Sequence, residues 1–281
     1  ASHGVLIMSN KRKIVISLYD HSANMVRPWA EKGYWCICYD IKHSEYTESE
    51  ICANGGVIQY IKADLHDHDN VRQILNLETP HNTPDDELCM VIAQPVCTDL
   101  AVSGAAHFAK KRAVDPDFQT KAASHAIVIE DCMKGRNIPY LIENPVSVLS
   151  TLFRKPDHTF QPADYGGYLD GSFGSTEFSQ PTHPRYPEYF PPKDAYSKKT
   201  CYWTGGGFVM PKKDPVEIIN YGSSNLHRKL GGSSARTKEI RSETPRGVSV
   251  AVSIYNSERG QFRWYRKMHS RLETPQWVKD N

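Results

Sequence analysis

The sequence lacks the features that mark several classes of protein. No apolar run approaches the roughly 18 residues of a membrane-spanning helix, and no signal peptide is recognisable. The seven cysteines are an odd number without any Cys-x-x-Cys pair, which favours reduced thiols over disulfides. Internal repeats are absent as well. We therefore expect a globular cytoplasmic protein without a membrane partner, and no motif indicates an obligate protein partner.

An excess of charge of one sign is also missing. The 34 lysines and arginines nearly balance 32 acidic residues, which gives a formal net charge of +2. This balance allows a nucleic-acid partner without requiring one. The length of 281 residues suits one large α/β domain, or one core with a small appendage.

Apolar, β-branched runs alternate with helix-like stretches in the first half of the chain. Runs typical of buried strands occupy residues 13–19, 35–39, 57–62, 88–93 and 140–142. Stretches with helical character occupy residues 25–32, residues 118–136 and a segment that begins near residue 70. This alternation predicts an α/β fold with a Rossmann-like, doubly wound and mostly parallel sheet.

The second half of the chain has a different composition. Residues 155–200 are rich in proline, tyrosine and glycine and show little periodicity, which favours an irregular, loop-rich insertion on the substrate side. Regular structure is expected again at residues 208–210 and 248–256. We therefore divide the chain into an expression-tag remnant or flexible N-terminus, a catalytic core, an irregular substrate-side region, a return to the core and a basic tail, at residues 1–12, 13–154, 155–207, 208–256 and 257–281.

Polar residues with chemical potential directly follow the predicted strands. They are Asp20, Asp40, Asp64, Cys97 and Glu143. In a doubly wound sheet, ligands bind outside the carboxyl ends of the strands. The sequence therefore predicts a functional site at this edge of the sheet.

Cys97 and Glu143 carry the clearest chemistry. A thiol at a strand-to-helix turn lies near a helix N-terminus, whose dipole lowers the thiol pKa and favours a nucleophilic thiolate. A carboxylate that leaves a buried strand loses solvation, so its pKa rises and it can hold a proton near neutral pH. The alternatives are a small buried side chain at Cys97 and a helix-capping or ion-pairing acid at Glu143. A thiolate beside a protonated carboxyl is what attack on a pyrimidine ring requires.

Two motifs give the chain a resemblance to a known family. Residues 97–104 (Cys-Thr-Asp-Leu-Ala-Val-Ser-Gly) resemble the Pro-Cys-Gln-Pro-Phe-Ser-x-Ala-Gly signature of carbon-5 cytosine-specific DNA methyltransferases, in particular the small phage or bacterial type. Residues 143–145 (Glu-Asn-Pro) resemble their Glu-Asn-Val, and residues 198–203 are similar to a Lys-Arg-Thr-x-Leu-Trp segment of small phage-type relatives. The resemblance implies a class I methyltransferase-like enzyme that modifies cytosine in DNA.

The same resemblance implies roles for individual residues. Cys97 is expected to attack carbon-6 of cytosine, while Glu143 contacts the cytosine edge and Asn144 supports the active-site turn. The residues expected to bind substrate are Pro95, Ser103, Pro145 and Lys199.

S-adenosylmethionine is the cofactor that the resemblance implies. Residues 244–250 are similar to the late segment that folds back onto the cofactor site in that family. The residues expected to bind the cofactor are Tyr19, Asp20, Asn24, Asp40, Ile41, Asp64 and Ser249. The chain departs from the family where His21, Ala23 and Asn24 stand in place of glycines, and Asn24 is expected to supply the positive φ of the missing glycine. A further departure is Val96, which separates the proline of the signature from the cysteine.

Three functions stay open at this level. The first is a DNA cytosine methyltransferase, and the second is a carbon-5-modifying enzyme that acts on a mononucleotide such as dCMP or uses an altered donor. The third is an inactive homologue that binds nucleic acid. No metal is expected: the side chains of the acid- and histidine-rich residues 64–69 are predicted to point apart, and Cys36 and Cys38 lack nearby ligand partners.

Overall fold

The computed structural model describes residues 11–172, 177–219, 230 and 234–257. The N-terminal residues 1–10 and the tail residues 258–281 lie outside the described residues. The chain forms an α/β fold around one eight-stranded sheet, in the order β3-β4-β2-β1-β5-β6-β8-β7. The predicted Rossmann-like, mostly parallel architecture is confirmed.

Five neighbouring strands run parallel in the centre of the sheet. They are β4 (Val57–Lys62), β2 (Trp35–Asp40), β1 (Arg12–Leu18), β5 (Asp86–Ala93) and β6 (Tyr140–Pro145). Each overlaps a run predicted from the sequence, because a parallel strand buried on both faces reads as a continuous apolar stretch. Their carboxyl ends meet at one edge of the sheet, where the predicted site residues follow.

Three further strands, which the sequence does not predict, complete the sheet. They are β3 (Glu48–Ile51), β7 (His158–Phe160) and β8 (Thr200–Gly205). Strand β3 pairs antiparallel with β4 at one edge, and β8 lies antiparallel between β6 and β7 near the other. The predicted irregular region therefore begins and ends with a strand. Between them it holds the short 3-10 helices η2 (Pro162–Tyr168), η3 (Glu177–Ser179) and η4 (Pro192–Asp194). Residues 208–210, for which the sequence predicts regular structure, have none.

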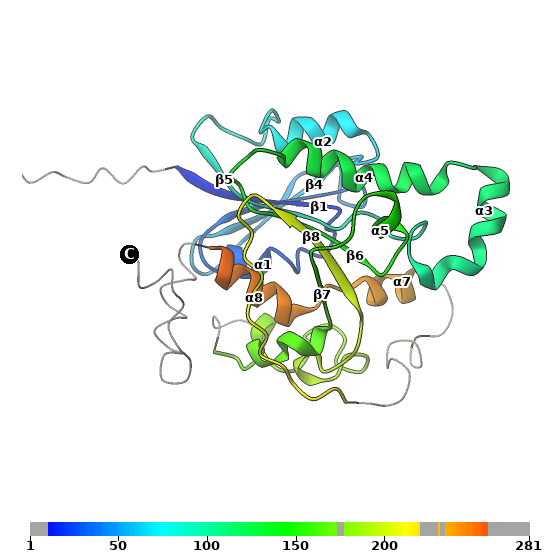
Figure 1. Ribbon diagram of the computed structural model, residues 1–281. Coiled ribbons are helices and arrows are strands. Elements are labelled where there is room, and N and C mark those ends of the chain that lie inside the picture. The colour runs from blue at the N-terminus through cyan, green and yellow to red at the C-terminus, as the bar shows by residue number, and fades with distance from the viewer. Residues whose placement is uncertain (1–10, 173–176, 220–229, 231–233, 258–281) are drawn as a thin grey trace, which may run out of the picture.

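Helices cover both faces of the sheet (Figure 1). The helices are α2 (His68–Leu75) and α4 (Phe118–Met133) on one face, and α1 (Arg27–Ala30) and α8 (Arg246–Asn256) on the other. Alternate residues of β1 supply the two cores: Ile16 packs with the α2 and α4 side, and Val15 with the α1 and α8 side. Full burial of one such aliphatic side chain contributes about 1.5–3 kcal/mol to stability.

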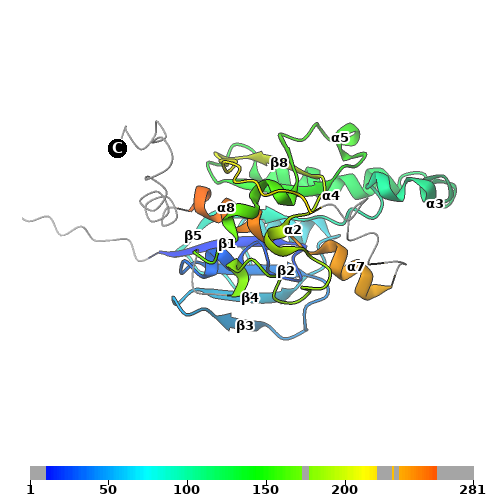
Figure 2. The ribbon, with the colours of Figure 1, turned by 90° about the horizontal axis from the view of Figure 1, so that it is seen from below.

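One helical segment projects away from this layered body. The 3-10 helix η1 (Val102–His107) and helix α3 (Phe108–Val114) contain no buried residue, and both Figure 1 and Figure 2 show α3 reaching outward. We call residues 102–114 the α3 arm. Within the described residues, two further helices are α5 (Leu149–Leu152) and α7 (Ala235–Ser242). No helix in the described part of the chain has the length and apolar character needed to cross a membrane.

Candidate active site

The loop after β5, residues 94–101, carries Cys97 and is held by the loop after β6. We call it the β5 loop. The Asn144 side chain at the end of β6 is fully buried, and its Nδ2 donates to the backbone oxygen of Pro95 at 3.0 Å. The backbone nitrogens of Val102 and Val148 donate across the two loops to Val146 and Leu100, at 3.2 and 3.0 Å. These bonds fix the half-buried Cys97 next to the end of β6.

Cys97 lies within electrostatic reach of Glu143 and Lys198. Strands β5 and β6 pair with Ala93 opposite Ile142, so Glu143 is the next residue at the carboxyl edge. Burial raises the pKa of Glu143, while the positive charge of Lys198 lowers it. A carboxyl in these surroundings can retain a proton at a higher pH than a solvated glutamate can, as the sequence predicts.

The pKa of Cys97 moves in the direction opposite to the sequence-based expectation. Burial raises the pKa of this thiol, the charge of Glu143 raises it further, and Lys198 lowers it. The expected helix-dipole effect is not what governs the thiol, because η1 begins only at Val102 and the residues between form a turn. A proton on Glu143 would remove the repulsion, so the thiolate and the protonated carboxyl favour each other.

The cation at the site comes from Lys198 rather than from the expected Lys199. Lys198 is half-buried, interacts electrostatically with both Cys97 and Glu143, and donates from Nζ to the backbone oxygen of Glu243 at 3.1 Å. Lys199 is exposed, and its charge acts on Cys201. Both lysines precede strand β8, which begins at the buried Thr200.

The other expected substrate residues occupy varied positions. Pro95 is buried and serves through its backbone oxygen, and Pro145 is half-buried as the last residue of β6. Ser103 is exposed at the base of the α3 arm. The contact of Pro95 is the hydrogen bond from Asn144, the residue that supports the β5 loop.

The loop after β1, residues 19–24, forms a tight turn without glycine. We call it the β1 loop. Tyr19 and Ala23 take the left-handed conformation, with φ of 59° and 58°, whereas the sequence assigns the positive φ to Asn24. The Asp20 carboxylate is almost completely buried and accepts hydrogen bonds from Ser17 Oγ at 2.8 Å and from the backbone nitrogen of Ala23 at 2.7 Å. Asp20 therefore braces the loop from inside, which corrects its predicted role as a cofactor ligand.

Acids stand at the ends of the next two strands. Asp40 is half-buried and accepts from the backbone nitrogen of Lys42 at 2.8 Å; Ile41 beside it is 49% exposed. Asp64 is exposed, and its charge raises the pKa of Tyr19 in addition to the larger effect of burial. The carboxyl edge of the sheet thus presents two acids and an accessible apolar side chain.

Ser249 faces the core instead of this edge. It is fully buried in α8, where its Oγ donates to the backbone oxygen of Pro245 at 2.9 Å and contacts Met25 Sδ at 3.1 Å. A hydroxyl engaged in this way cannot reach a ligand at the strand ends. The prediction of Ser249 as a cofactor residue is therefore corrected to a packing contact between α8 and the segment after the β1 loop.

Three histidines form a cluster that the sequence does not predict. His66 Nδ1 lies 3.1 Å from His125 Nε2, and His68 Nε2 lies 3.3 Å from His125 Nδ1. Burial and the two neighbouring rings lower the pKa of His125 to about 4. The expectation that side chains in residues 64–69 point apart is wrong, because His66 and His68 meet the same ring of α4. His125 gives no sequence signal, being distant in the chain. Among the described residues, no group of three or more histidines, cysteines or acids has a metal-holding arrangement.

Comparisons with known proteins add little to this geometry. No protein-family model and no curated protein matches the chain. A solved structure that it partly resembles is a mutant short-chain dehydrogenase/reductase from Serratia marcescens, which is 16% identical over 41% of this chain and 50% of that chain, with a TM-score of 0.23. The chain thus spans about half the length of that structure. An overlap of this quality supports no inference about function.

Proposed function

We propose that the chain is a cytosine carbon-5 methyltransferase-like enzyme that transfers the methyl group of S-adenosylmethionine to cytosine in DNA. The observation that carries the proposal is the placement of Cys97 and Glu143 on neighbouring parallel strands, at one sheet edge and within each other's field. Lys198 supplies a positive charge to both. A cytoplasmic location is part of the proposal, and none of the seven cysteines forms a disulfide.

The proposed reaction uses these groups in one sequence of steps. The Cys97 thiolate forms a bond to carbon-6 of the cytosine ring, while Glu143 donates a proton or a hydrogen bond to ring nitrogen-3. Electron density then reaches carbon-5, which takes the methyl group. The methyl donor leaves as the neutral thioether S-adenosylhomocysteine. Loss of the carbon-5 proton to water, departure of the sulfur from carbon-6 and return of the nitrogen-3 proton to Glu143 then restore the thiolate and the protonated carboxyl. Lys198 favours the thiolate at the start and at the end of the cycle.

The β1 loop and the strand ends fit a nucleoside-bearing donor. Ala23 keeps the tight left-handed turn that glycine supplies in the family, and this leaves the backbone of the loop at the sheet edge. Asp40 and Asp64 are acids suited to accept hydrogen bonds from ribose hydroxyls and from an adenine amino group. Tyr19 follows β1, the neighbour of β2 in the sheet, and is half-buried. S-adenosylmethionine bound there would supply an electrophilic methyl group.

The topology of the sheet also supports the proposal. In the doubly wound dinucleotide-binding order the last strands continue the parallel sheet. Here the antiparallel strand β8 is inserted between β6 and β7, which resembles the sheet of class I methyltransferases. Strand β8 begins at Thr200, shortly after Lys198, and its pairing with β6 keeps this lysine near Cys97 and Glu143.

Trapping the covalent intermediate tests the proposed function. We expect an oligonucleotide that contains 5-fluorocytosine, incubated with S-adenosylmethionine, to form a stable adduct on Cys97, because fluorine at carbon-5 cannot leave as a proton does. Peptide mass spectrometry locates the adduct. Absence of an adduct on Cys97, in protein shown to bind both reactants, would contradict the proposal and favour the inactive nucleic-acid-binding homologue.

The α3 arm supports a polymeric substrate over a mononucleotide. The arm contains Lys110, Lys111 and Arg112 but no acidic residue, and it follows the β5 loop that carries Cys97. An exposed basic segment with no buried residue gains little stability from packing against the protein core. Its cationic side chains suit contact with a phosphate backbone. Lys111 also forms an ion pair with Asp99 of the β5 loop, which links the arm to the site.

Neutralising the arm is expected to weaken polymer binding in a salt-dependent manner. The double variant Lys110→Gln/Arg112→Gln removes two cations, so the slope of log affinity for duplex DNA against log salt should fall by about 2. The matched control is Lys134→Gln, an exposed lysine at the far end of α4, which should leave the slope unchanged. Fluorescence anisotropy with labelled DNA measures both. Tight binding of dCMP with no salt-dependent DNA binding would favour the mononucleotide alternative.

A further inference from the structure

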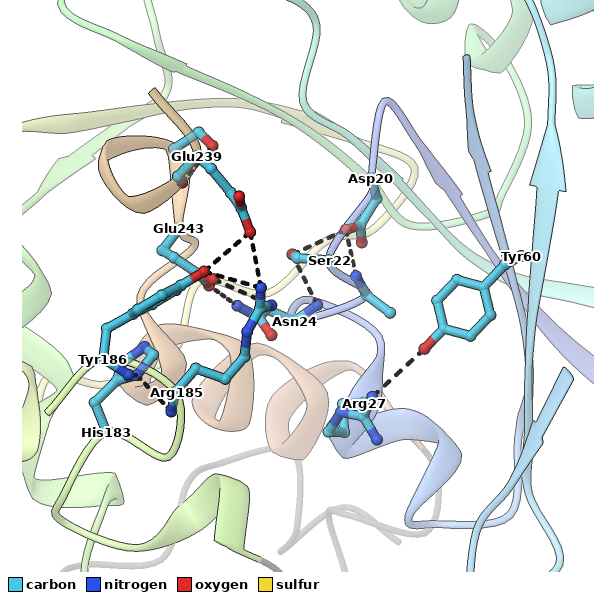
Figure 3. Close-up of polar contacts among 12 residues, drawn as sticks. Asp20, Ser22, Asn24, Arg27, Tyr60, His183, Arg185, Tyr186, Glu239 and Glu243 are labelled. Atoms are coloured by element: carbon cyan, nitrogen blue, oxygen red, sulfur yellow. Dashed lines mark hydrogen bonds and ion pairs between the residues drawn. The ribbon is translucent and has the colours of Figure 1, made fainter. Parts of the chain in front are cut away.

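The corner between α7 and α8, residues 243–245, joins three parts of the candidate site. The Glu243 carboxylate is 4% exposed, and its Oε2 accepts a hydrogen bond from Nδ2 of Asn24 in the β1 loop (Figure 3). Its backbone oxygen accepts from Lys198 Nζ at 3.1 Å. The next residue, Thr244, accepts from Gln94 Nε2 of the β5 loop at 2.8 Å. One corner thus contacts the β1 loop, the β5 loop and the catalytic cation.

The charges around Glu243 link it to the catalytic pair. Burial raises the pKa of Glu243; Arg185 and Asn24 lower it most, Glu239 raises it, and Lys198 lowers it. Arg185 forms an ion pair with Glu243 Oε1 at 3.3 Å and a second one with Glu239 at 2.9 Å. Lys198 is therefore shared: its charge acts on Glu243 as well as on Cys97 and Glu143.

We propose that Glu243 is a positioning residue that couples the occupancy of the β1 loop to the reactivity of Cys97 through Lys198. The proposal rests on the proposed function only in taking the β1 loop as part of the donor site. A ligand that moves Asn24 changes the bond on one oxygen of Glu243, and the backbone oxygen of the same residue holds the amine whose charge acts on the thiol. Coupling between two sites is reciprocal, so the state of Cys97 also affects binding at the β1 loop.

The reactivity of the thiol without any donor tests the link from Glu243 to Cys97. The rate of Cys97 alkylation by iodoacetamide is measured against pH in the full chain, with peptide mass spectrometry to assign the modified cysteine. Glu243→Gln keeps an acceptor for Asn24 and the backbone oxygen that holds Lys198, but it removes the negative charge that offsets the charge of this lysine. The uncompensated lysine charge stabilises the thiolate, so the midpoint of the pH profile should move to lower pH by about half a unit.

Glu239→Gln is the matched control. Glu239 is 48% exposed, forms an ion pair with the same Arg185 and accepts a hydrogen bond from Tyr186, whereas the bonds to Asn24 and Lys198 belong to Glu243. Its midpoint should stay at the wild-type value, since water screens an exposed charge. Coincident profiles for Glu243→Gln and the wild type would overturn the proposal. If circular dichroism shows that Glu243→Gln does not fold, Asn24→Ala replaces it. This variant removes a hydrogen bond to the ionised Glu243 carboxylate, so the alkylation midpoint should move in the same direction. An unchanged midpoint in Asn24→Ala would also overturn the proposal.

A second comparison tests the coupling to the donor. S-adenosylhomocysteine, which has no methyl group to transfer, is expected to shift the alkylation midpoint of the wild type and to shift that of Glu243→Gln less. An equal shift in both proteins would overturn the coupling. If calorimetry detects no binding of S-adenosylhomocysteine to the wild type, the proposed donor and the coupling to it both fail, while the donor-free comparison still decides whether Glu243 controls Cys97.

Discussion

Replacing Cys97 with serine is expected to lower the rate of methyl transfer to cytosine by at least about 10⁴-fold, as removal of a covalent nucleophile does in other enzymes. The hydroxyl of serine is too weak an acid for Glu143 and Lys198 to yield an alkoxide at neutral pH. Glu143→Gln should lower the rate by about 10²–10⁴-fold, because the amide can donate a hydrogen bond to ring nitrogen-3 but cannot transfer a proton. Single-turnover transfer of a radiolabelled methyl group measures both losses.

The control for this prediction lies on the same strand. Cys89→Ser changes a half-buried cysteine near the start of β5, whereas Cys97 follows the end of that strand. The rate in this variant should stay within a few-fold of the wild type, since nothing at the carboxyl edge changes. A Cys97→Ser protein that retains activity within tenfold of the wild type would show that sulfur forms no bond to the substrate.

The placement of Cys97 and Glu143 at one sheet edge could be predicted because it depends mainly on strand order. Continuous apolar runs define β5 and β6, and consecutive strands of such a sheet are neighbours in most cases, as these two are. Cys97 follows β5 and Glu143 lies near the end of β6, so both stand at the same edge. The raised pKa of Glu143 follows from its exit out of a buried strand, which is also visible in the sequence.

Features that depend on distant or irregular segments could not be predicted. The choice of Lys198 over Lys199 depends on an antiparallel strand that lacks the continuous apolar character of the central strands. The direction in which the pKa of the Cys97 thiol moves depends on burial and on neighbouring charges, because the turn at Cys97 does not lead directly into a helix. The brace formed by Asp20 and the meeting of His66 with His125 depend on local turn geometry and on helix packing, for which the residues carry no periodic signal.

The buried ion pair between Arg246 and Asp194 is another feature that could not be predicted from the sequence. Its removal has the largest expected effect on the stability of the fold. Both residues are 1% exposed, and they come from α8 and from the short 3-10 helix η4. The guanidinium donates to the backbone oxygens of Phe178, Gln180, Pro181 and Thr182, at 3.0, 2.9, 3.2 and 3.3 Å. Asp194 Oδ2 accepts from the backbone nitrogens of Arg246 and Gly247, at 2.6 and 3.1 Å, and so caps the start of α8.

Arg246→Met is expected to lower the free energy of unfolding by about 3–5 kcal/mol, because it leaves Asp194 as a buried charge without its guanidinium and the four carbonyls without a donor. Asp194 and Lys193 also hold left-handed backbones, with φ of 48° and 58°, which persist only while the surrounding bonds enforce them. Urea unfolding measures the change. The matched control is Arg236→Met, the same substitution at an exposed position of α7, which should stay within about 0.5 kcal/mol of the wild type.

The outcome also bears on the site, because the start of α8 directly follows Glu243 and Thr244. If the buried pair anchors this corner, the β1 and β5 loops should open more often in Arg246→Met protein that still folds. The measurement is amide hydrogen exchange, which should become faster at Asn24 and Gln94. A loss of less than about 1 kcal/mol, with unchanged exchange, would mean that packing of α8 against the sheet holds the corner without help from the ion pair.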